Sequence, residues 1–169
     1  EGWSIFVSSL AVNLYTATNI VVLGMLTNNV IVGYYSAADK LITCVRRGIY
    51  AVSDAIYPFI SKMMKDDISK GLQFIKKQIF LYLVVGLIGC TSLFFFSDTI
   101  VKLLFGADYN LTVDVLRILS FVPLAVAIST VFGEETMLPL NMNSAYSRTL
   151  VLAAFFSLLS IFPLCYLWG

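Results

Sequence analysis

The chain has 169 residues, of which 59% are hydrophobic and only 12% are charged, and its mean hydropathy is +0.89. Soluble domains typically carry about 25% charged residues, so this composition excludes an ordinary water-soluble domain and favours a membrane protein. A net charge of +1 gives no reason to expect a nucleic-acid partner. Histidine is absent, which removes the commonest general base and metal ligand. We therefore expect no metal, no cofactor and no nucleic acid.

Five stretches are close to the length of about 20 mostly apolar residues that a membrane-spanning helix needs. They cover residues 3–26, 32–60, 74–96, 111–133 and 146–168. The stretches lack the period-2 alternation of barrel strands and are too long for them, so helices are predicted. The sequence thus predicts an all-α fold, a polytopic transmembrane helical bundle that forms one transmembrane region over 1–169.

The first span, 3–26, carries a polar face. Ser9, Asn13 and Thr16 follow one another at spacings of four and three residues, which places them on one side of a helix. Asn19 lies four residues after Tyr15. The Thr27-Asn28-Asn29 segment then predicts a tight turn.

The second span, 32–60, holds most of the charged residues. Five polar residues fall on one helical stripe, with spacings of seven, four, four and three: Asp39, Arg46, Tyr50, Asp54 and Tyr57. Each charge at membrane depth costs about 2.5–3.5 kcal/mol on insertion scales, so the stripe should face protein or water. It predicts a hydrated cavity within the bundle. The alternative is internal neutralisation, with Asp39 paired to Lys40 and Asp54 paired to the arginines.

Adjacent arginines favour the cavity. Arg46 and Arg47 are about 100° apart on a helix, so their side chains can flank a cavity instead of sharing one partner. Arginine stays charged at any working pH and can bind a phosphate through two parallel hydrogen bonds. The pair predicts an anionic ligand.

The segments after the second span set the expected orientation. Residues 61–73 predict a charged loop, and lysines gather in and beside it: Lys62, Lys65, Lys70, Lys76 and Lys77. The third span, 74–96, is apolar nearly all round. In 97–110, Ser97-Asp98 as an N-cap and Gly106 as a stop predict a short interfacial helix with a single lysine, Lys102. The positive-inside rule then places the lysine-rich loop and Glu1 in the cytoplasm, and Gly169 outside.

The fourth span, 111–133, carries Asp114 and Arg117, three residues apart and expected to pair. Pro123 should kink this helix because it removes one backbone hydrogen bond. Glu134 and Glu135 follow at the cytoplasmic end, where we expect solvated loop charges and not a proton relay. The Leu138–Asn141 segment predicts the last turn before the mostly apolar fifth span, 146–168.

The cysteines and the chain ends carry two further expectations. Cys44, Cys90 and Cys165 are odd in number, lie far apart in apolar runs and have no metal-binding spacing, so they should be small packing residues. No signal-peptide pattern follows Glu1, and Gly169 comes directly after an apolar run. We expect a fragment of a longer protein.

Several segments together resemble a known family. Ser8-Ser9-Leu10-Ala11, the run from Asn19 to Gly24, the segment from Val32 through Gly33-Tyr34-Tyr35-Ser36-Ala37-Ala38 to Ile42, and Tyr57-Pro58-Phe59-Ile60-Ser61 look like the second half of O-antigen flippases (Wzx type). These belong to the polysaccharide transport branch of the multidrug/oligosaccharidyl-lipid/polysaccharide exporter superfamily. The resemblance implies two six-helix lobes around a central cavity, with the five spans similar to helices seven to eleven and the first lobe missing.

The resemblance also implies a function. The substrate would be an undecaprenyl-pyrophosphate-linked oligosaccharide, the O-antigen repeat unit, moved by alternating access from the cytoplasmic to the periplasmic leaflet of the bacterial inner membrane. In the cavity, Arg46 and Arg47 would hold the pyrophosphate, alongside the charged Asp39, Lys40 and Asp54. Sugar hydroxyls would contact a second set of residues: Ser9, Asn13, Asn19, Tyr50 and Tyr57. Further partners would be membrane lipids, the missing N-terminal lobe and a polysaccharide polymerase.

Other functions stay open at this point. A multidrug/cation antiporter of the same superfamily would favour acidic groups in the cavity. A non-transporting membrane scaffold in polysaccharide assembly is compatible with the same sequence. A glycan polymerase or ligase needs a large outward catalytic loop, and 97–110 is small and mostly apolar. We therefore expect the protein not to be an enzyme.

Overall fold

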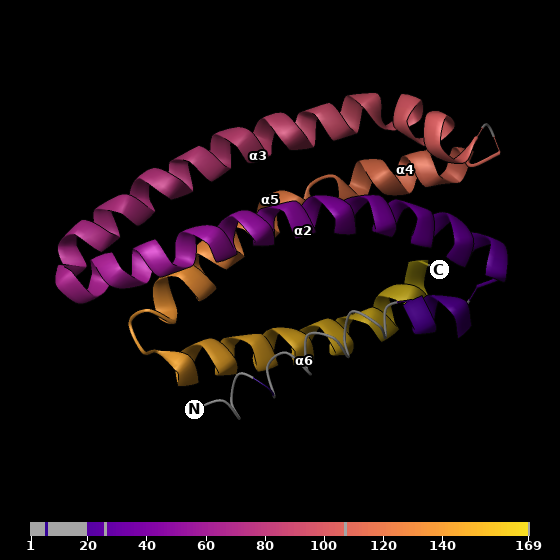
Figure 1. Cartoon of the computed structure of the whole chain (residues 1–169). Coiled ribbons are helices and arrows are strands. Elements are labelled where there is room, and N and C mark those ends of the chain that lie inside the picture. The colour runs from indigo at the N-terminus through magenta and orange to yellow at the C-terminus, as the bar shows by residue number, and fades with distance from the viewer. Residues whose placement is uncertain (1–5, 7–19, 26, 107, 169) are drawn as a thin grey trace. The chain divides into compact units, whose positions relative to one another are not determined.

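The computed structural model describes residues 6, 20–25, 27–106 and 108–168, with side chains described up to residue 160 apart from residue 158. These residues form helices and turns with no strand, which confirms the all-α prediction. The named elements are α2 (Asn29–Asp66), α3 (Ile68–Phe105), α4 (Asn110–Leu119), α5 (Val122–Thr130), the π-helical segment η1 (Val131–Met137) and α6 (Asn143–Trp168) (Figure 1).

The chain divides into two compact units. One combines residues 1–33 with 141–169, and the other is residues 34–140. In the first unit, residues 20–25 are helical, and the Asn28 side chain accepts hydrogen bonds from the backbone of Val30 and Ile31, at 3.1 and 2.9 Å. The predicted turn at 27–29 is therefore where α2 begins. Most of the predicted span 3–26, including Ser9, Asn13 and Asn19, lies outside the described residues.

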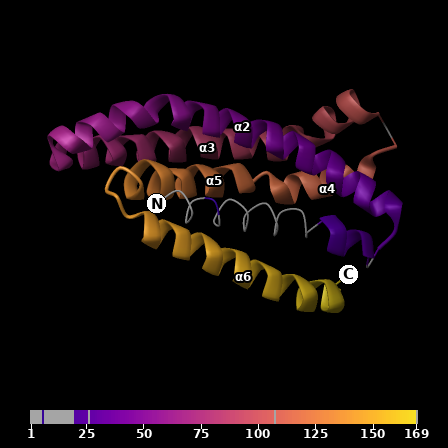
Figure 2. The same cartoon turned by 60° about the horizontal axis from the view of Figure 1, so that its bottom comes forward.

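All of α2 after residue 33 belongs to the second unit, where it forms an antiparallel hairpin with α3; each of the two helices has 38 residues (Figures 1 and 2). The only residue between them is Asp67. The predicted charged loop over 61–73 is therefore wrong, because both helices continue through it. Asp67 accepts hydrogen bonds from the backbone N–H groups of Ser69 and Lys70, at 2.9 and 3.4 Å, and so caps the start of α3.

The far end of α3 also differs from the prediction. The helix continues to Phe105, so 97–105 is not a separate helix, although the ribbon changes direction near this end (Figures 1 and 2). Ser97 is not an N-cap: its hydroxyl donates to the carbonyl of Phe94 at 2.9 Å. Nothing in the sequence interrupts the helix before Gly106, whose φ of 92° ends it. Gly106 is the stop that the sequence predicted.

The chain returns along α3 in three helical pieces, α4, α5 and η1 (Figure 2). Residues 120 and 121 separate α4 from α5, and Pro123 lies in the first turn of α5. Proline has no N–H to donate to the carbonyl of Leu119, which accounts for the interruption. The predicted kink is therefore present.

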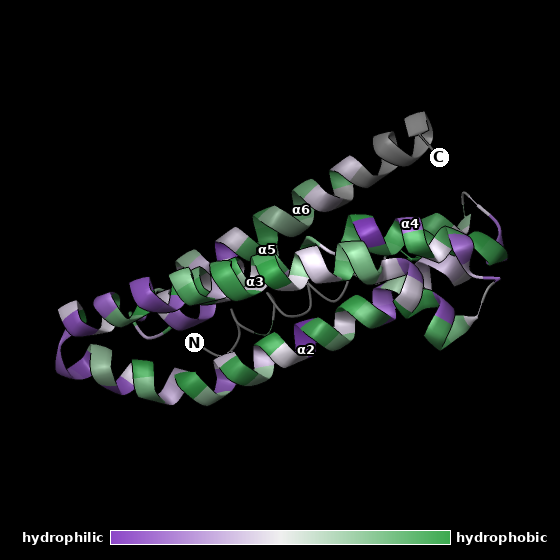
Figure 3. Ribbon diagram, turned by 90° about the horizontal axis from the view of Figure 1, so that it is seen from above, coloured by the Kyte–Doolittle hydropathy of each residue, from purple (hydrophilic) through white to green (hydrophobic). Residues whose placement is uncertain are grey.

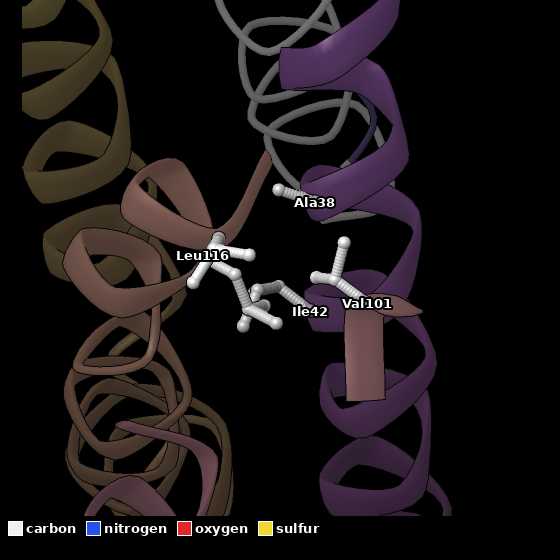
Figure 4. Packing of buried hydrophobic residues seen from close by; sticks show 5 residues of the cluster. Ala38, Ile42, Val101 and Leu116 are labelled. Carbon is white, nitrogen blue, oxygen red and sulfur yellow. The ribbon is translucent and has the colours of Figure 1, made fainter. Parts of the chain in front are cut away.

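Two apolar clusters hold the second unit together. The first joins α2, α3 and α4 through Ala38, Ile42, Val101, Val113 and Leu116 (Figure 4). The second joins α2, α3 and η1 through Ile60, Met64, Ile75 and Val131. Each residue of the first cluster is at most 6% exposed, so the apolar packing is complete at that point.

The outer side of α3 is apolar and exposed. Phe80 and Phe95 are 70% and 72% exposed, although such side chains avoid water. By length and composition, α3 and residues 110–137 can each cross a membrane, with mean hydropathies of 2.4 and 2.1 over their most apolar windows. Figure 3 shows mostly green, hydrophobic residues along the middle of α3, green mixed with purple along α2, and purple, hydrophilic residues where the two helices meet. These features are those of an all-α membrane protein.

The helices contain four of the predicted spans. Residues 32–60 lie in α2, 74–96 in α3, 111–133 across α4, α5 and η1, and 146–168 in α6. Crossing the membrane at those bounds stays a prediction. At about 1.5 Å per residue, α2 and α3 are each about 57 Å long, roughly twice the 30 Å hydrocarbon core. If both helices cross the membrane, part of the hairpin extends beyond it.

Candidate functional site

The polar stripe of α2 contains one ion pair. Arg46 Nη2 lies 3.4 Å from Asp39 Oδ1 and donates a 2.6 Å hydrogen bond to Thr43 Oγ1. The side chains of Arg46 and Asp39 are 22% and 27% exposed. The partner of Asp39 is therefore Arg46, two turns away, and not the neighbouring Lys40 of the alternative hypothesis. Pairing lowers the cost of placing both charges at membrane depth.

One hydrogen-bond donor of the Arg46 side chain is unused in these contacts. Its Nε is buried and has no hydrogen-bond partner within the described part of the chain. Arg47, the next residue, is exposed and makes no ion pair with any residue that the structure describes. The two guanidiniums thus differ: one is held by Asp39 and Thr43, and the other can meet a ligand directly.

The other predicted cavity residues lie along the same helix, α2. Lys40 and Asp54 are exposed, Tyr50 is 39% exposed and Tyr57 is half-buried. At about 100° per residue, the stripe is centred roughly 70° around α2 from the face that packs on α3, α4 and η1. The stripe therefore borders the packed face of α2 and lies largely outside it.

The predicted pair in α4 is also present. Arg117 Nη1 lies 3.5 Å from Asp114 Oδ1, and Arg117 Nε donates to Ser97 Oγ at 3.1 Å. The guanidinium carbon is 6.0 Å from the centre of the Phe94 ring, within cation–π range. These contacts join α4 to α3 through the buried Ser97. Of the cysteines, Cys90 is buried as predicted, whereas Cys44 is exposed.

A buried carboxylate was missed by the sequence reasoning. Glu135 is 0% exposed, so the expectation that it is a solvated loop charge is wrong. Its Oε1 accepts a 2.6 Å hydrogen bond from the hydroxyl of Ser53 in α2, and its Oε2 accepts a 2.5 Å hydrogen bond from the Gln78 amide in α3. Three helices therefore meet at one carboxyl group. Glu134, next to it, is half-buried.

The π-helical turn explains how Glu135 comes to face inward. A π-helix fits an extra residue into a turn, which shifts the direction of the side chains after it. Within η1, the Thr136 hydroxyl donates to the carbonyl of Val131, five residues back, at 2.7 Å. The sequence signals that remain are weak: Ser53 and Gln78 are uncharged polar residues on helix faces that are otherwise apolar.

Two more polar atoms beside Glu135 lack partners. Gln78 Oε1 and Tyr82 Oη are both buried and have no hydrogen-bond partner in the structure described. Tyr82 lies one turn after Gln78 on α3, and its hydroxyl is close to the Gln78 side chain, although no hydrogen bond of good geometry joins the two. Orphaned buried polar atoms are rare in native proteins, and they often mark functional sites.

Tyr82 also borders an apolar cavity of about 600 Å³ between α2, α3 and α5. Gly48, Gly86 and Pro123 are among its lining residues. At Gly86 an added Cβ would lie 2.6 Å from Leu124 Cδ1, so the glycine permits α3 and α5 to approach closely. The cavity provides apolar surroundings next to the Glu135 cluster.

Comparison with known proteins agrees with this membrane architecture. A family model described as "Polysaccharide biosynthesis protein" matches residues 1–64. Two curated relatives are each named "Putative O-antigen transporter". The one from Escherichia coli (strain K12) is 31% identical over 97% of this chain, and the one from Shigella dysenteriae is 27% identical over 100% of it. No solved structure matches the chain.

These matches support the resemblance to O-antigen and polysaccharide flippases that was seen in the sequence. The chain spans about 40% of the length of these relatives, 40% of the first and 42% of the second.

Proposed function

We propose that the chain is part of a flippase that moves an undecaprenyl-pyrophosphate-linked oligosaccharide from the cytoplasmic to the periplasmic leaflet of a bacterial inner membrane. The names of the family and of the relatives point to a transporter and not to an enzyme. Apolar helices long enough to cross a membrane support the same assignment. The protein would be multi-pass, with a first lobe that completes the cavity.

The observation that carries the proposal is the unequal pair of arginines on α2. Arg47 is exposed without an ion pair among the described residues, so it can bind one phosphate of a pyrophosphate through two hydrogen bonds. Arg46 is held by Asp39 and Thr43, which fix its direction. When the pyrophosphate arrives, Arg46 can exchange Asp39 for the second phosphate. Before the substrate binds, Asp39 is the counter-ion of Arg46.

The remaining stripe residues fit the sugar. Tyr50 and Tyr57 carry hydroxyl groups that can donate to or accept from sugar hydroxyls. Lys40 and Asp54 are exposed charges on the same helix and would hydrogen-bond the polar head group. Ser9, Asn13 and Asn19 of the first span would complete the set. The prenyl tail would stay in lipid, and rocking of one lobe against the other would switch access.

The antiporter alternative fits the described residues less well. A cationic drug needs an accessible carboxylate. Asp39 is occupied by Arg46, and Glu135 is fully buried. Of the acids predicted for the cavity, only Asp54 is exposed.

The test is flipping of the lipid-linked oligosaccharide by the full-length protein in vesicles. Arg47→Ala should lower the initial rate about tenfold or more, because a hydrogen bond to a charged group contributes about 1.5–3 kcal/mol. Arg47→Lys keeps the charge and loses the bidentate geometry, so it should fall between Arg47→Ala and the unmodified protein. Arg46→Ala should also slow flipping.

Lys65→Ala provides the matched control, since it removes one exposed positive charge of α2 from the hairpin end. This variant should flip at the unmodified rate. If Arg46→Ala and Arg47→Ala both flip at that rate while present at equal levels, the assignment of the arginines to the pyrophosphate is wrong.

A further inference from the structure

Glu135 is a buried carboxyl group without a positive partner. No ion pair to it is found among residues 6, 20–25, 27–106 and 108–160, and its two hydrogen-bond partners, Ser53 and Gln78, are neutral. It belongs to the region 110–137, which is apolar enough to cross a membrane. An ionised carboxylate in such surroundings is costly unless a cation or a proton neutralises it.

The titratable groups around it do not supply that neutralisation. From α3, the nearby titratable group is the Tyr82 hydroxyl. From α2, the contact is the hydroxyl of Ser53, and the adjacent Asp54 is exposed. On η1 itself, Glu134 precedes Glu135 and would carry the same sign of charge. The described residues also contain no cluster of His, Cys, Asp or Glu that could hold a metal ion.

The hydrogen-bond pattern offers a place for one proton. The two ends of a glutamine amide differ only in which atom is nitrogen and which is oxygen, and its orientation follows from the hydrogen bonds. With Nε2 toward Glu135, the buried Gln78 Oε1 has no partner. With the amide rotated by 180°, Oε1 would lie at the 2.5 Å position and would accept a hydrogen bond from a protonated carboxyl group. The amide nitrogen would then take the position that the unpartnered Gln78 Oε1 occupies in the structure.

We propose that Glu135 is a proton-binding site, and that its carboxyl group carries a proton while α2, α3 and η1 are packed together. The protonated Oε2 of Glu135 would donate a hydrogen bond to Gln78 Oε1, and the Ser53 hydroxyl would donate a hydrogen bond to Glu135 Oε1. Release would require water to reach the carboxyl group, and so requires η1 to separate from the hairpin. In a transporter, this links one proton to one change of conformation. That coupling role rests on the proposed flippase function, whereas the proton site does not.

The local backbone is suited to such a movement. A π-turn holds one residue more than an α-turn, so its conversion to α-helix rotates the following side chains by about 100°. Such a rotation would take Glu135 out of the contact with Ser53 and Gln78. The preceding interruption at residues 120–121 and the turns after Met137 leave α5 and η1 as a short piece with a break at each end. Tyr82 and the apolar cavity beside it would receive the moving side chains.

The first experiment detects the proton itself. Infrared spectra of the full-length protein in detergent, recorded across a pH titration, should show the C=O stretch of a protonated carboxylic acid at neutral pH. Glu135→Gln should remove this band, and Glu134→Gln should leave it in place. Both variants should keep the helical circular dichroism of the unmodified protein, because glutamine has nearly the same shape as glutamate. If the band is absent at neutral pH, or if it survives Glu135→Gln, the proton site is disproved.

The second experiment tests the coupling. Full-length protein in vesicles containing a pH-sensitive dye is given an imposed pH gradient, and lipid flipping and proton movement are recorded together. Glu135→Gln should abolish proton movement and reduce the stimulation of flipping by the gradient at least tenfold, while Glu134→Gln behaves as the unmodified protein. Gradient-stimulated flipping that survives Glu135→Gln would overturn the coupling. An infrared band without any flipping by the unmodified protein would refute the proposed function and support the proton site. Stimulation by a sodium gradient in place of a pH gradient would overturn the choice of the proton.

Discussion

Asp67 is a single residue on which the hairpin of the second unit depends. Its backbone is extended, with φ of −157° and ψ of 104°, and its side chain caps α3. The pKa of this carboxyl is held below its usual value, first by the hydrogen bond from the Lys70 backbone and further by that from Ser69 and by the Lys70 charge, which lies 3.4 Å away. A cap of this kind satisfies N–H groups that the first turn of a helix leaves without partners.

This shift predicts a dependence of stability on pH. The pKa of Asp67 is lower in the folded protein than in the unfolded chain, where an aspartate titrates near about 3.9. Its contribution is therefore complete above that unfolded value and is lost as the pH falls through the folded one. Asp67→Asn keeps a capping side chain without a charge, so its melting temperature should change less between roughly pH 6 and pH 3. Thermal melts followed by circular dichroism in detergent measure this, and equal pH slopes for the two proteins would contradict it.

Glu135 shows why part of the site could not be predicted from sequence. Its partners lie 57 and 82 residues away along the chain, so no local pattern connects them. The π-turn then changes the side-chain direction that a regular helical period would give. The stripe from Asp39 to Tyr57 could be predicted, because a fixed spacing along one helix determines which residues share a side. There the contact between Asp39 and Arg46 lies within the predicted stripe.

At the scale of the elements, apolar segments identified the middles of the helices but not their ends. Hydropathy reports which residues can lie in lipid, whereas a helix continues wherever no residue interrupts it. Lysine is a good helix former, so residues 61–66 continue α2 beyond the apolar segment. The kink at Pro123 and the helix end at Gly106 could be predicted because each residue changes the backbone directly. Proline lacks an N–H group, and glycine can adopt a positive φ.

The contact that closes the α2–α3 hairpin predicts the effect of one substitution. At Gly71 an added Cβ would lie 2.5 Å from Met64 Cγ and 3.3 Å from its Cα, so α2 would have to move. Gly71→Ala should therefore destabilise the protein by about 1–3 kcal/mol, as overpacking commonly does. The melting temperature should fall.

Gly89→Ala on the same helix is the matched control. An added Cβ there meets nothing within 4 Å, and alanine is favoured over glycine in helices by up to about 1 kcal/mol. The melting temperature of this variant should stay the same or rise. If the two substitutions shift the melting temperature in the same direction and by the same amount, close packing at Gly71 is not what holds the hairpin together.

At the scale of the whole molecule, distances along α2 from the hairpin end show how far each site lies from that end. Arg46 precedes the end of α2 by 20 residues, which corresponds to about 30 Å along the helix, and Ser53 by 13 residues, or about 20 Å. The arginine pair is therefore about 10 Å further from the hairpin end than the Ser53–Glu135 contact. A ligand bound to the arginines would lie deeper in the membrane than the proposed proton site.

The lysines at the hairpin end predict the side of the membrane on which this end lies. Lys62, Lys65 and Lys70 are exposed there, as are Lys76 and Lys77 on the first turns of α3. At the other end of α3, Lys102 is paired with Asp98 at 2.9 Å. Positive charge on short connections stays in the cytoplasm during insertion, so the hairpin end should be cytoplasmic.

Cysteine labelling in intact cells tests this orientation. In full-length protein with Cys44, Cys90 and Cys165 replaced by serine, Lys65→Cys should react with a membrane-impermeant maleimide only after the inner membrane is permeabilised. Lys102→Cys should react before that step, because α3 has 38 residues and Lys102 lies near the end of this helix that is far from the hairpin connection. The reverse pattern would place the hairpin in the periplasm. Glu135 would then lie nearer the periplasmic leaflet, so its proton would be taken up from that side of the membrane.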